Sequence, residues 1–304
     1  MRRWIPQPSA GRWVALGLLA AVLVLALAVI VQLARALAGP PEAWQVDMRL
    51  FGLVVALILL LAMAAWLAYR AAAALTLSYE LDRNGLYICW LGNRAVVPLD
   101  RITSIDIGAP SAWAPWQLIQ GIGSYWGRAH LNEGVALHLF TTQPPARSLV
   151  IYTADGAYAI SSADHEAFVQ DLEQRRNLGA AKPLTTKLQP SRIFLYEFWN
   201  DSTVRGLLLV ALLLNLVALL VLAMRYPTLA PLLEMRFDAT GEVAELRPRH
   251  QALFMPLAAF GLSLLNVALG LALYRRERLG ARLLQGASVI VQLLFAVALA
   301  TVIL

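Results

Sequence analysis

Residues 13–34 read WVALGLLAAVLVLALAVIVQLA and carry no charged side chain. An α-helix needs roughly 20 apolar residues to cross the hydrocarbon core of a bilayer. Four more uncharged stretches of similar length follow, at residues 50–69, 206–224, 251–274 and 283–304. The sequence therefore predicts an integral membrane protein with five transmembrane helices.

The composition separates a membrane part from a polar part. Hydrophobic residues make up 59% of the chain, charged residues 14%, and the mean hydropathy is +0.62, whereas residues 75–200 have the polarity of an ordinary globular domain. The first apolar stretch exceeds the 7 to 15 residues of a signal-peptide core, which favours a retained signal anchor. Cys89 is the single cysteine, so an internal disulfide and a cysteine-based zinc site are excluded.

Arginines at the membrane flanks predict the orientation, because short cytoplasmic segments collect Lys and Arg. Such residues precede the first span and fill the link between the fourth and fifth: Arg2, Arg3, Arg12, Arg275, Arg276, Arg278 and Arg282. This places the N-terminus and the long insert in the cytoplasm of a bacterial cell and the C-terminus outside its plasma (inner) membrane. Arginines in the loop at 225–250 favour the opposite orientation, in which the insert is outside. Arg70, Arg192 and Arg205 lie beside the insert and favour a cytoplasmic insert. The net charge of +6 belongs to these flanks and gives no support to nucleic-acid binding.

The insert is expected to form seven strands followed by one helix. Strand-like runs lie at 75–81, 86–91, 95–98, 102–107, 135–141, 148–153 and 157–160. Asn84-Gly85 indicates a tight hairpin turn with positive φ angles. Ser161 or Ser162 can cap the helix, with Asp164 at the acidic position of a capping box, and the helix should end near Arg176.

This order of elements, together with specific residues, resembles the bacterial membrane-anchored PH-domain family. The residues that carry the resemblance are GIGSYWGR at 121–128, LVIYTADGAYAIS at 149–161, and 164–168. The family usually has Ser-Pro-x-Asp before the helix, and here Ser162 replaces the proline. The resemblance implies an α+β membrane protein with a PH-like β-barrel, about seven strands plus a C-terminal helix, inserted between transmembrane helices. The resemblance implies no catalytic or ligand-binding chemistry for particular residues.

The C-terminal part is similar to the membrane segment of bacterial toxin-immunity proteins. The similarity lies in YPTL at 226–229, MRFDATGEV at 235–243, MPL at 255–257 and Asn266 inside the next span. Arg236 stands where that pattern has histidine, which puts a histidine-dependent role in doubt. Residues 237–241 are expected to form a compact turn.

The sequence gives no sign of catalysis, a metal or a cofactor. None of the five spans holds an ionisable residue near its middle, which argues against an intramembrane protease. The four histidines lack carboxylate or cysteine partners at metal-ligand spacing, and His138 is expected to be an ordinary strand residue. Gly121, Gly123 and Gly127 suggest a phosphate loop only superficially, because no Lys-Ser/Thr pair follows. We expect a non-enzymatic protein without cofactors.

An aromatic loop is the first candidate for interaction. Trp113, Trp116, Tyr125 and Trp126 lie between two expected strands, and tryptophan favours the lipid headgroup layer. The loop could rest on the membrane or on the transmembrane helices, and packing over the barrel is an equally good interpretation. A third interpretation is that the loop forms a groove for a partner protein.

Polar residues within the predicted transmembrane spans are the second candidate for interaction. Asn215, Asn266 and Gln292 can bond between helices, which is the default interpretation. Asn266 and Gln292 could meet in mid-bilayer, and a hydrated pathway could use them. Arg275, Arg276, Arg278 and Arg282 could attract anionic lipid, but setting the topology suffices to explain them.

The expected organisation has four parts: a two-helix membrane segment at 1–74, a cytoplasmic PH-like domain at 75–178, a linker at 179–203 and a three-helix membrane segment at 204–304. The first function hypothesis is a membrane-anchored protein whose domain binds membrane lipid, a protein partner or its own copies, but no nucleic acid. The second is an envelope-stress or toxin-immunity protein. The third, a small transporter or channel, is weakened by the lack of an internal repeat and of buried charge.

Overall fold

A computed structural model describes residues 1–108, 122–130, 135–189, 196–237 and 243–303. The fold is α+β and 60% helical. Contacts divide the chain into two compact units, of which the first comprises residues 1–24 and 62–194 and the second residues 25–61 and 195–304. Helices α1 (Gly11–Ala36) and α2 (Met48–Thr76) each contribute one end to each unit.

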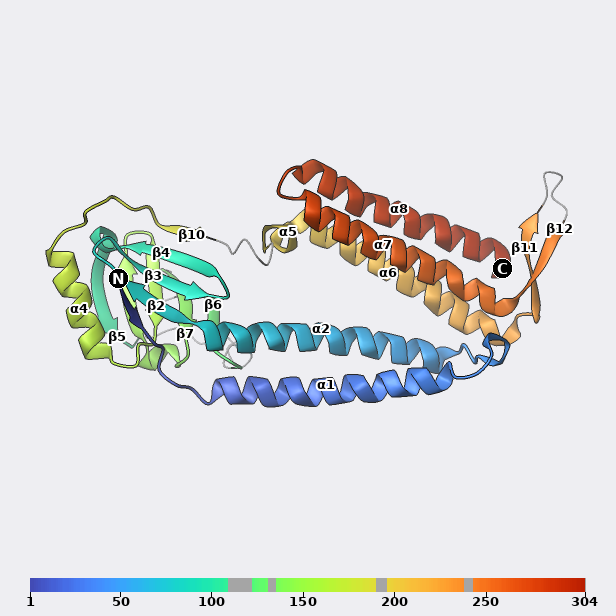
Figure 1. The fold of residues 1–304 in the computed structure, drawn as a ribbon, viewed down its shortest axis with the longest axis horizontal. Helices are drawn as coiled ribbons and strands as arrows, with labels where there is room; N and C mark the ends of the chain where they lie inside the picture. The colour runs from blue at the N-terminus through green and yellow to red at the C-terminus, as the bar shows by residue number, and fades with distance from the viewer. Residues whose placement is uncertain (109–121, 131–134, 190–195, 238–242, 304) are drawn as a thin grey trace. The chain divides into compact units, whose positions relative to one another are not determined.

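The first unit contains two five-stranded sheets (Figure 1). The first sheet has the order β1-β2-β3-β4-β10, with every pair antiparallel. Its strands are β1 (Arg2–Trp4), β2 (Ser78–Leu81), β3 (Gly85–Trp90), β4 (Asn93–Pro98) and β10 (Lys187–Gln189). The sheet thus joins the start of the chain to a segment that follows the expected domain.

The second sheet has the order β5-β8-β9-β7-β6, in which β7 and β9 run parallel and the other pairs antiparallel. Its strands are β5 (Ile102–Ile107), β6 (Tyr125–His130), β7 (Ala136–Thr141), β8 (Leu149–Thr153) and β9 (Gly156–Ile160). Helix α4 (His165–Asn177) packs Phe168 and Leu172 into the apolar core that the two sheets share. The helix closes one side of the sheet pair by burying this i, i+4 stripe.

All seven expected strand runs contain a strand, and the helix ends one residue beyond the expected position. The barrel itself is not closed, which corrects the expected architecture. Strands β1, β6 and β10 were not expected. The run from Leu75 also starts too early, because helix α2 continues to Thr76 and the strand begins at Ser78.

Two local expectations are wrong in detail. Neither Asn84 nor Gly85 has a positive φ; instead the Asp82 carboxylate accepts hydrogen bonds from both backbone amides, at 2.7 and 2.8 Å. Positive φ angles do occur in the next hairpin, at Leu91 (φ 44°) and Gly92 (φ 75°), where the sequence pattern also indicates a turn. Asp164 itself is the N-cap of α4, because its carboxylate accepts from the Ala167 amide at 2.9 Å.

Five helices among the described residues are long and apolar enough to cross a membrane, and each covers one predicted span. Besides α1 and α2 these are α6 (Ser202–Arg225), α7 (Phe254–Leu273) and α8 (Arg278–Ile303). The last of these, α8, packs against both α6 and α7 in the second unit (Figure 1). These five helices fit a membrane-associated protein.

The second unit also has short elements at the helix ends. Helix α5 (Tyr196–Asn200) precedes α6, and the hairpin of β11 (Leu232–Phe237) and β12 (Val243–Pro248) lies between α6 and α7. Most of the turn expected at residues 237–241 lies outside the described residues. Short 3-10 helices occupy Pro41–Ala43, Leu99–Arg101, Pro145–Arg147, Tyr226–Thr228 and Arg249–Leu253.

Candidate binding groove and polar contacts

A groove of about 250 Å³ lies on the open side of the sheet pair in the first unit. Strands β3, β4 and β10 line it from the first sheet, and β6, β7 and β9 line it from the second. Among the described strands, β10 and β6 stand at the ends of their sheets. The groove therefore lies between one end strand of each sheet, in a barrel that is not closed.

Aromatic rings form the walls of this groove. The ring centroids of Trp90 and Trp126 are 4.4 Å apart, those of Trp126 and Phe140 are 4.8 Å apart, and those of Trp90 and Phe140 are 5.0 Å apart. His138 stacks on Tyr158 at 5.2 Å on the same lining. Such edge-to-face and stacked contacts hold large rings in fixed positions, so the walls are preformed.

One polar group of the groove lacks a partner. Trp90 is only 4% exposed, and its indole N–H has no hydrogen-bond acceptor among the described residues. A buried indole N–H usually finds an acceptor, because an unmade hydrogen bond costs free energy. Burial, and then the charge of Asp155, raise the pKa of Tyr158, so its phenol stays protonated at neutral pH. The groove thus has aromatic walls, and the unpartnered Trp90 N–H lies buried behind them.

The aromatic residues singled out from the sequence are divided by the structure. Trp126 lines the groove, and Tyr125, its neighbour on β6, is half-buried and does not line it. Successive residues of a strand point to opposite faces, which explains the difference. Trp113 and Trp116 lie outside the described residues.

Sequence reasoning missed Trp90, Phe140 and Tyr158, because each sits in a strand run that reads as ordinary core. The sequence did contain a signal for them. His138 and Phe140 are two residues apart on β7, so their rings lie next to each other on the same face of the strand.

The first hairpin offers no cluster of basic groups. Its Arg83 donates to the carbonyl oxygens of Leu178 and Gly179, both at 2.9 Å.

Nothing among the described residues forms a group of three or more His, Cys, Asp or Glu side chains that could hold a metal ion. Cys89 is half-buried on β3, and burial raises the pKa of its thiol. A thiol with a raised pKa is a poor nucleophile, because the thiolate is the reactive form.

The polar residues predicted in the spans do meet, in pairs other than the one considered. The Asn215 amide donates to Gln292 Oε1 at 3.0 Å and to the Pro256 carbonyl at 2.8 Å. Gln292 donates to Ser263 Oγ at 2.9 Å, while Asn266 donates to Ser288 Oγ at 3.1 Å. Asn215, Ser263 and Gln292 therefore link α6, α7 and α8, whereas Asn266 joins only α7 and α8.

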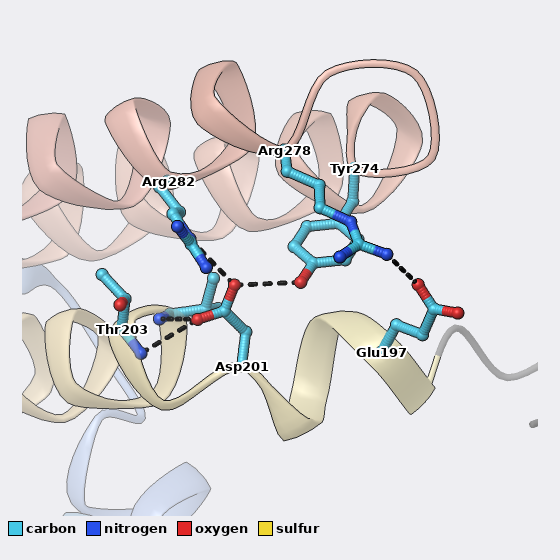
Figure 2. Close-up of polar contacts among 7 residues, drawn as sticks. Glu197, Asp201, Thr203, Tyr274, Arg278 and Arg282 are labelled. Atoms are coloured by element: carbon cyan, nitrogen blue, oxygen red, sulfur yellow. Dashed lines mark hydrogen bonds and ion pairs between the residues drawn. The ribbon is translucent and has the colours of Figure 1, made fainter. Parts of the chain in front are cut away.

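A second polar cluster ties the start of α6 to the link between α7 and α8 (Figure 2). Asp201 Oδ2 accepts from Tyr274 Oη and from Arg282 Nε, both at 2.9 Å. Asp201 Oδ1 caps α6 by accepting from the Thr203 amide at 3.0 Å. One buried carboxylate thereby holds the ends of three helices.

The electrostatics of this cluster keep Asp201 charged. Burial raises the pKa of its carboxyl, but hydrogen bonds from Arg282, Tyr274 and the two backbone amides outweigh burial and lower the pKa overall. Burial and the Asp201 carboxylate raise the pKa of Tyr274, which keeps its hydroxyl a donor.

The four arginines of the link have different roles. Arg282 pairs with Asp201, and Arg278 pairs with Glu197 at 2.7 Å on the surface (Figure 2). Arg275 and Arg276 are exposed. Two of the four charges are thus engaged in contacts inside the second unit, which the sequence did not indicate.

Comparison with known proteins finds one family match, which lies within the first unit. Residues 77–176 match the family model described as the bacterial PH domain. No curated protein and no solved structure matches the chain. The match ends before the C-terminal helices, so the similarity of that part to toxin-immunity proteins stays a prediction.

Proposed function

We propose that this chain is a non-enzymatic, membrane-anchored binding protein whose PH domain holds an extended segment of a protein partner in the aromatic groove. The five apolar helices would anchor it in the plasma membrane, with the N-terminus and the domain in the cytoplasm and the C-terminus outside. The function is thus recruitment of a partner to the membrane surface.

The observation that carries the proposal is the groove between the end strands β10 and β6. An extended peptide binds to a sheet edge through backbone hydrogen bonds, and pockets for its side chains supply specificity. Here β10 and β6 are the end strands of their sheets, so each has one edge that pairs with no further described strand. The aromatic walls suit an apolar side chain of the segment.

The helices of the second unit support an anchoring role rather than transport. Asn215, Ser263 and Gln292 bond to one another and to a backbone carbonyl, which is how polar side chains hold apolar helices together. A transport pathway would leave such groups for a substrate or for water.

Site-specific photo-crosslinking in cells tests the proposal. Benzoylphenylalanine replaces Thr186 beside the groove in the full-length protein, and the control carries it at Glu173 on the exposed face of α4. We expect a discrete protein adduct from position 186 and none from position 173. Adducts of the same pattern from both positions, or adducts with lipid alone, would contradict the proposal.

A matched pair of variants then ties the adduct to the groove. Trp126→Ala removes a wall of the groove, and Tyr125→Ala changes the next residue of the same strand, which does not line it. We expect the first change to abolish the adduct from position 186 and the second to leave it. Equal loss with both variants would mean that the strand matters and the groove does not.

A further inference from the structure

A second cavity, of about 380 Å³, lies in the first unit where the N-terminal segment approaches the end of α2. Residues 5–9 and Arg12 form one wall, the end of α2 and Leu77 form another, and Gly123, Thr142 and Ala163 of the domain complete it. It is separate from the aromatic groove, with which it shares no lining residue.

Hydrogen bonds fix the wall that the N-terminal segment provides. The Gln7 amide donates to the Ser161 carbonyl at 2.7 Å, and the Gln7 carbonyl accepts from Thr142 Oγ1 at 2.6 Å. The Ile5 carbonyl accepts from the Ala163 amide at 3.0 Å, and the Gly11 carbonyl accepts from the Gly123 amide at 3.0 Å. The backbone that leads into Arg12 is therefore held against the domain up to the residue before it.

Arg12 brings a positive charge to this cavity and has an unsatisfied donor. Its Nε atom is buried and has no acceptor among the described residues. Arg70, by contrast, donates Nε to the Ile122 carbonyl at 3.0 Å. A guanidinium offers donors in a fixed fork that suits phosphate and carboxylate oxygens, and a buried donor without a partner costs free energy. The cavity therefore favours an anion at Arg12.

Apolar groups beside Arg12 indicate which anion. Ile5 and Leu75 line the cavity and are 70% and 57% exposed. Arg12 lies in the first turn of α1 and Leu75 in the last turn of α2, at the ends of two helices long enough to cross a membrane. A residue at the end of a spanning helix lies at the level of the lipid headgroups.

We propose that this cavity binds the phosphate of an anionic phospholipid. Arg12 donates to the phosphate oxygens, and the glycerol and first acyl carbons lie along Ile5 and Leu75. The site goes beyond the partner groove, and it couples the domain to one lipid at the point where both N-terminal helices meet it.

Binding is measured by native mass spectrometry on the delipidated full-length protein in detergent, titrated with phosphatidylglycerol. Diacylglycerol, which lacks the phosphate, and inorganic phosphate, which lacks the apolar part, are the two comparison ligands. We expect a saturable phosphatidylglycerol adduct and no comparable adduct with either comparison ligand. Equal binding of diacylglycerol would remove the phosphate from the proposal, and equal binding of inorganic phosphate would remove the lipid.

Variants locate the adduct. Because a charge-assisted hydrogen bond is lost, Arg12→Gln should weaken this binding by about tenfold or more. Arg12→Lys should retain part of it, and Arg176→Gln, which removes an exposed positive charge of α4, should leave it unchanged. Equal weakening by Arg12→Gln and Arg176→Gln would reduce the effect to net charge and overturn the site.

A second variant keeps Arg12 in place. Leu75→Glu puts a carboxylate into the cavity at an exposed position, where it repels phosphate and can pair with Arg12. We expect it to weaken phosphatidylglycerol binding as strongly as Arg12→Gln does, with the far-ultraviolet circular dichroism unchanged. Undiminished binding by this folded variant would place the lipid elsewhere.

Discussion

The two units treat their buried polar groups differently. In the first unit, the Trp90 N–H and Arg12 Nε lack acceptors, and each residue lines a cavity. In the second unit, Asn215, Gln292 and Asp201 bond to groups of neighbouring helices. The second unit has exceptions among its described residues, since Gln285 Oε1, Tyr226 Oη and His250 Nδ1 are buried without a hydrogen-bond partner.

This difference follows from what each unit has to do for stability. Strands of the first unit share an apolar core with α4, so burial of apolar surface stabilises this unit. Apolar helices in a lipid environment gain little from burying more apolar surface, and polar contacts fix their register instead. The two unpartnered donors of the first unit therefore draw attention because their residues line cavities, whereas the bonded polar groups of the second unit explain how its helices are held together.

The largest effect is expected where the N-terminal strand enters the first unit. Trp4 packs edge-on against Phe168 at 5.5 Å, and its Nε1 donates to Asp171 at 3.3 Å. Trp4→Ala should destabilise this unit by about 3–5 kcal/mol, because a large buried ring is removed. Hydrogen–deuterium exchange of strand peptides in detergent measures it.

The control changes the adjacent residue of the same strand. Arg3 is exposed, so Arg3→Ala should alter the free energy of unfolding by no more than about 0.5 kcal/mol. Exchange in the strands that is unaffected by Trp4→Ala would show that β1 is not part of the folded unit.

The next effect concerns the carboxylate that joins three helix ends in the second unit. Asp201→Ala should destabilise this unit by about 2–4 kcal/mol, because Arg282 and Tyr274 lose their shared acceptor and α6 loses its cap. Glu197→Ala breaks an ion pair whose side chains are 66% and 56% exposed and should cost less than about 1 kcal/mol. Chemical denaturation in detergent, followed by exchange in α6 and α8, compares them. Similar costs would remove the distinction between the buried and the exposed pair.

Much of this fold follows from the sequence, because two kinds of pattern are strong. Uncharged stretches of about 20 residues identify all five long helices, and strand patterns in residues 75–160 identify every described strand there except β6. The short end strands β1 and β10 could not be identified this way. Three residues such as Arg2–Trp4 show no period of their own and become a strand only through pairing with β2.

The candidate sites followed from the sequence only in part, because they depend on which strands come together. Trp126 was found as one of a cluster of aromatic residues, but its partners Trp90 and Phe140 come from strands β3 and β7. Gln292 was identified as polar in an apolar helix, and its partner depends on how α6 and α8 are rotated. Pairing across 77 residues of sequence, as between Asn215 and Gln292, leaves no local trace.

Acid should weaken the second unit through Asp201. Its pKa is lowered in the folded protein, so its contribution is complete above the ordinary carboxyl pKa of about 3.9 and is lost as the pH falls through the folded value. We expect the stability difference between the wild type and Asp201→Asn to shrink below about pH 4. A difference that stays constant from pH 7 to pH 3 would show that the charge of Asp201 contributes nothing.

The smallest effect tests whether the polar contacts of the second unit serve packing. A double-mutant cycle of Asn215→Ala and Gln292→Ala should give a coupling energy of about 0.6–1.7 kcal/mol, as is found for hydrogen bonds between membrane helices. Leu213→Ala with Gln292→Ala is the control, because Leu213 is exposed on the same helix and should not couple. A coupling near zero, together with labelling of position 292 by a water-soluble reagent, would favour a hydrated pathway. The contrast between the two units would then fail, because both would hold polar side chains that are available to a ligand or to water.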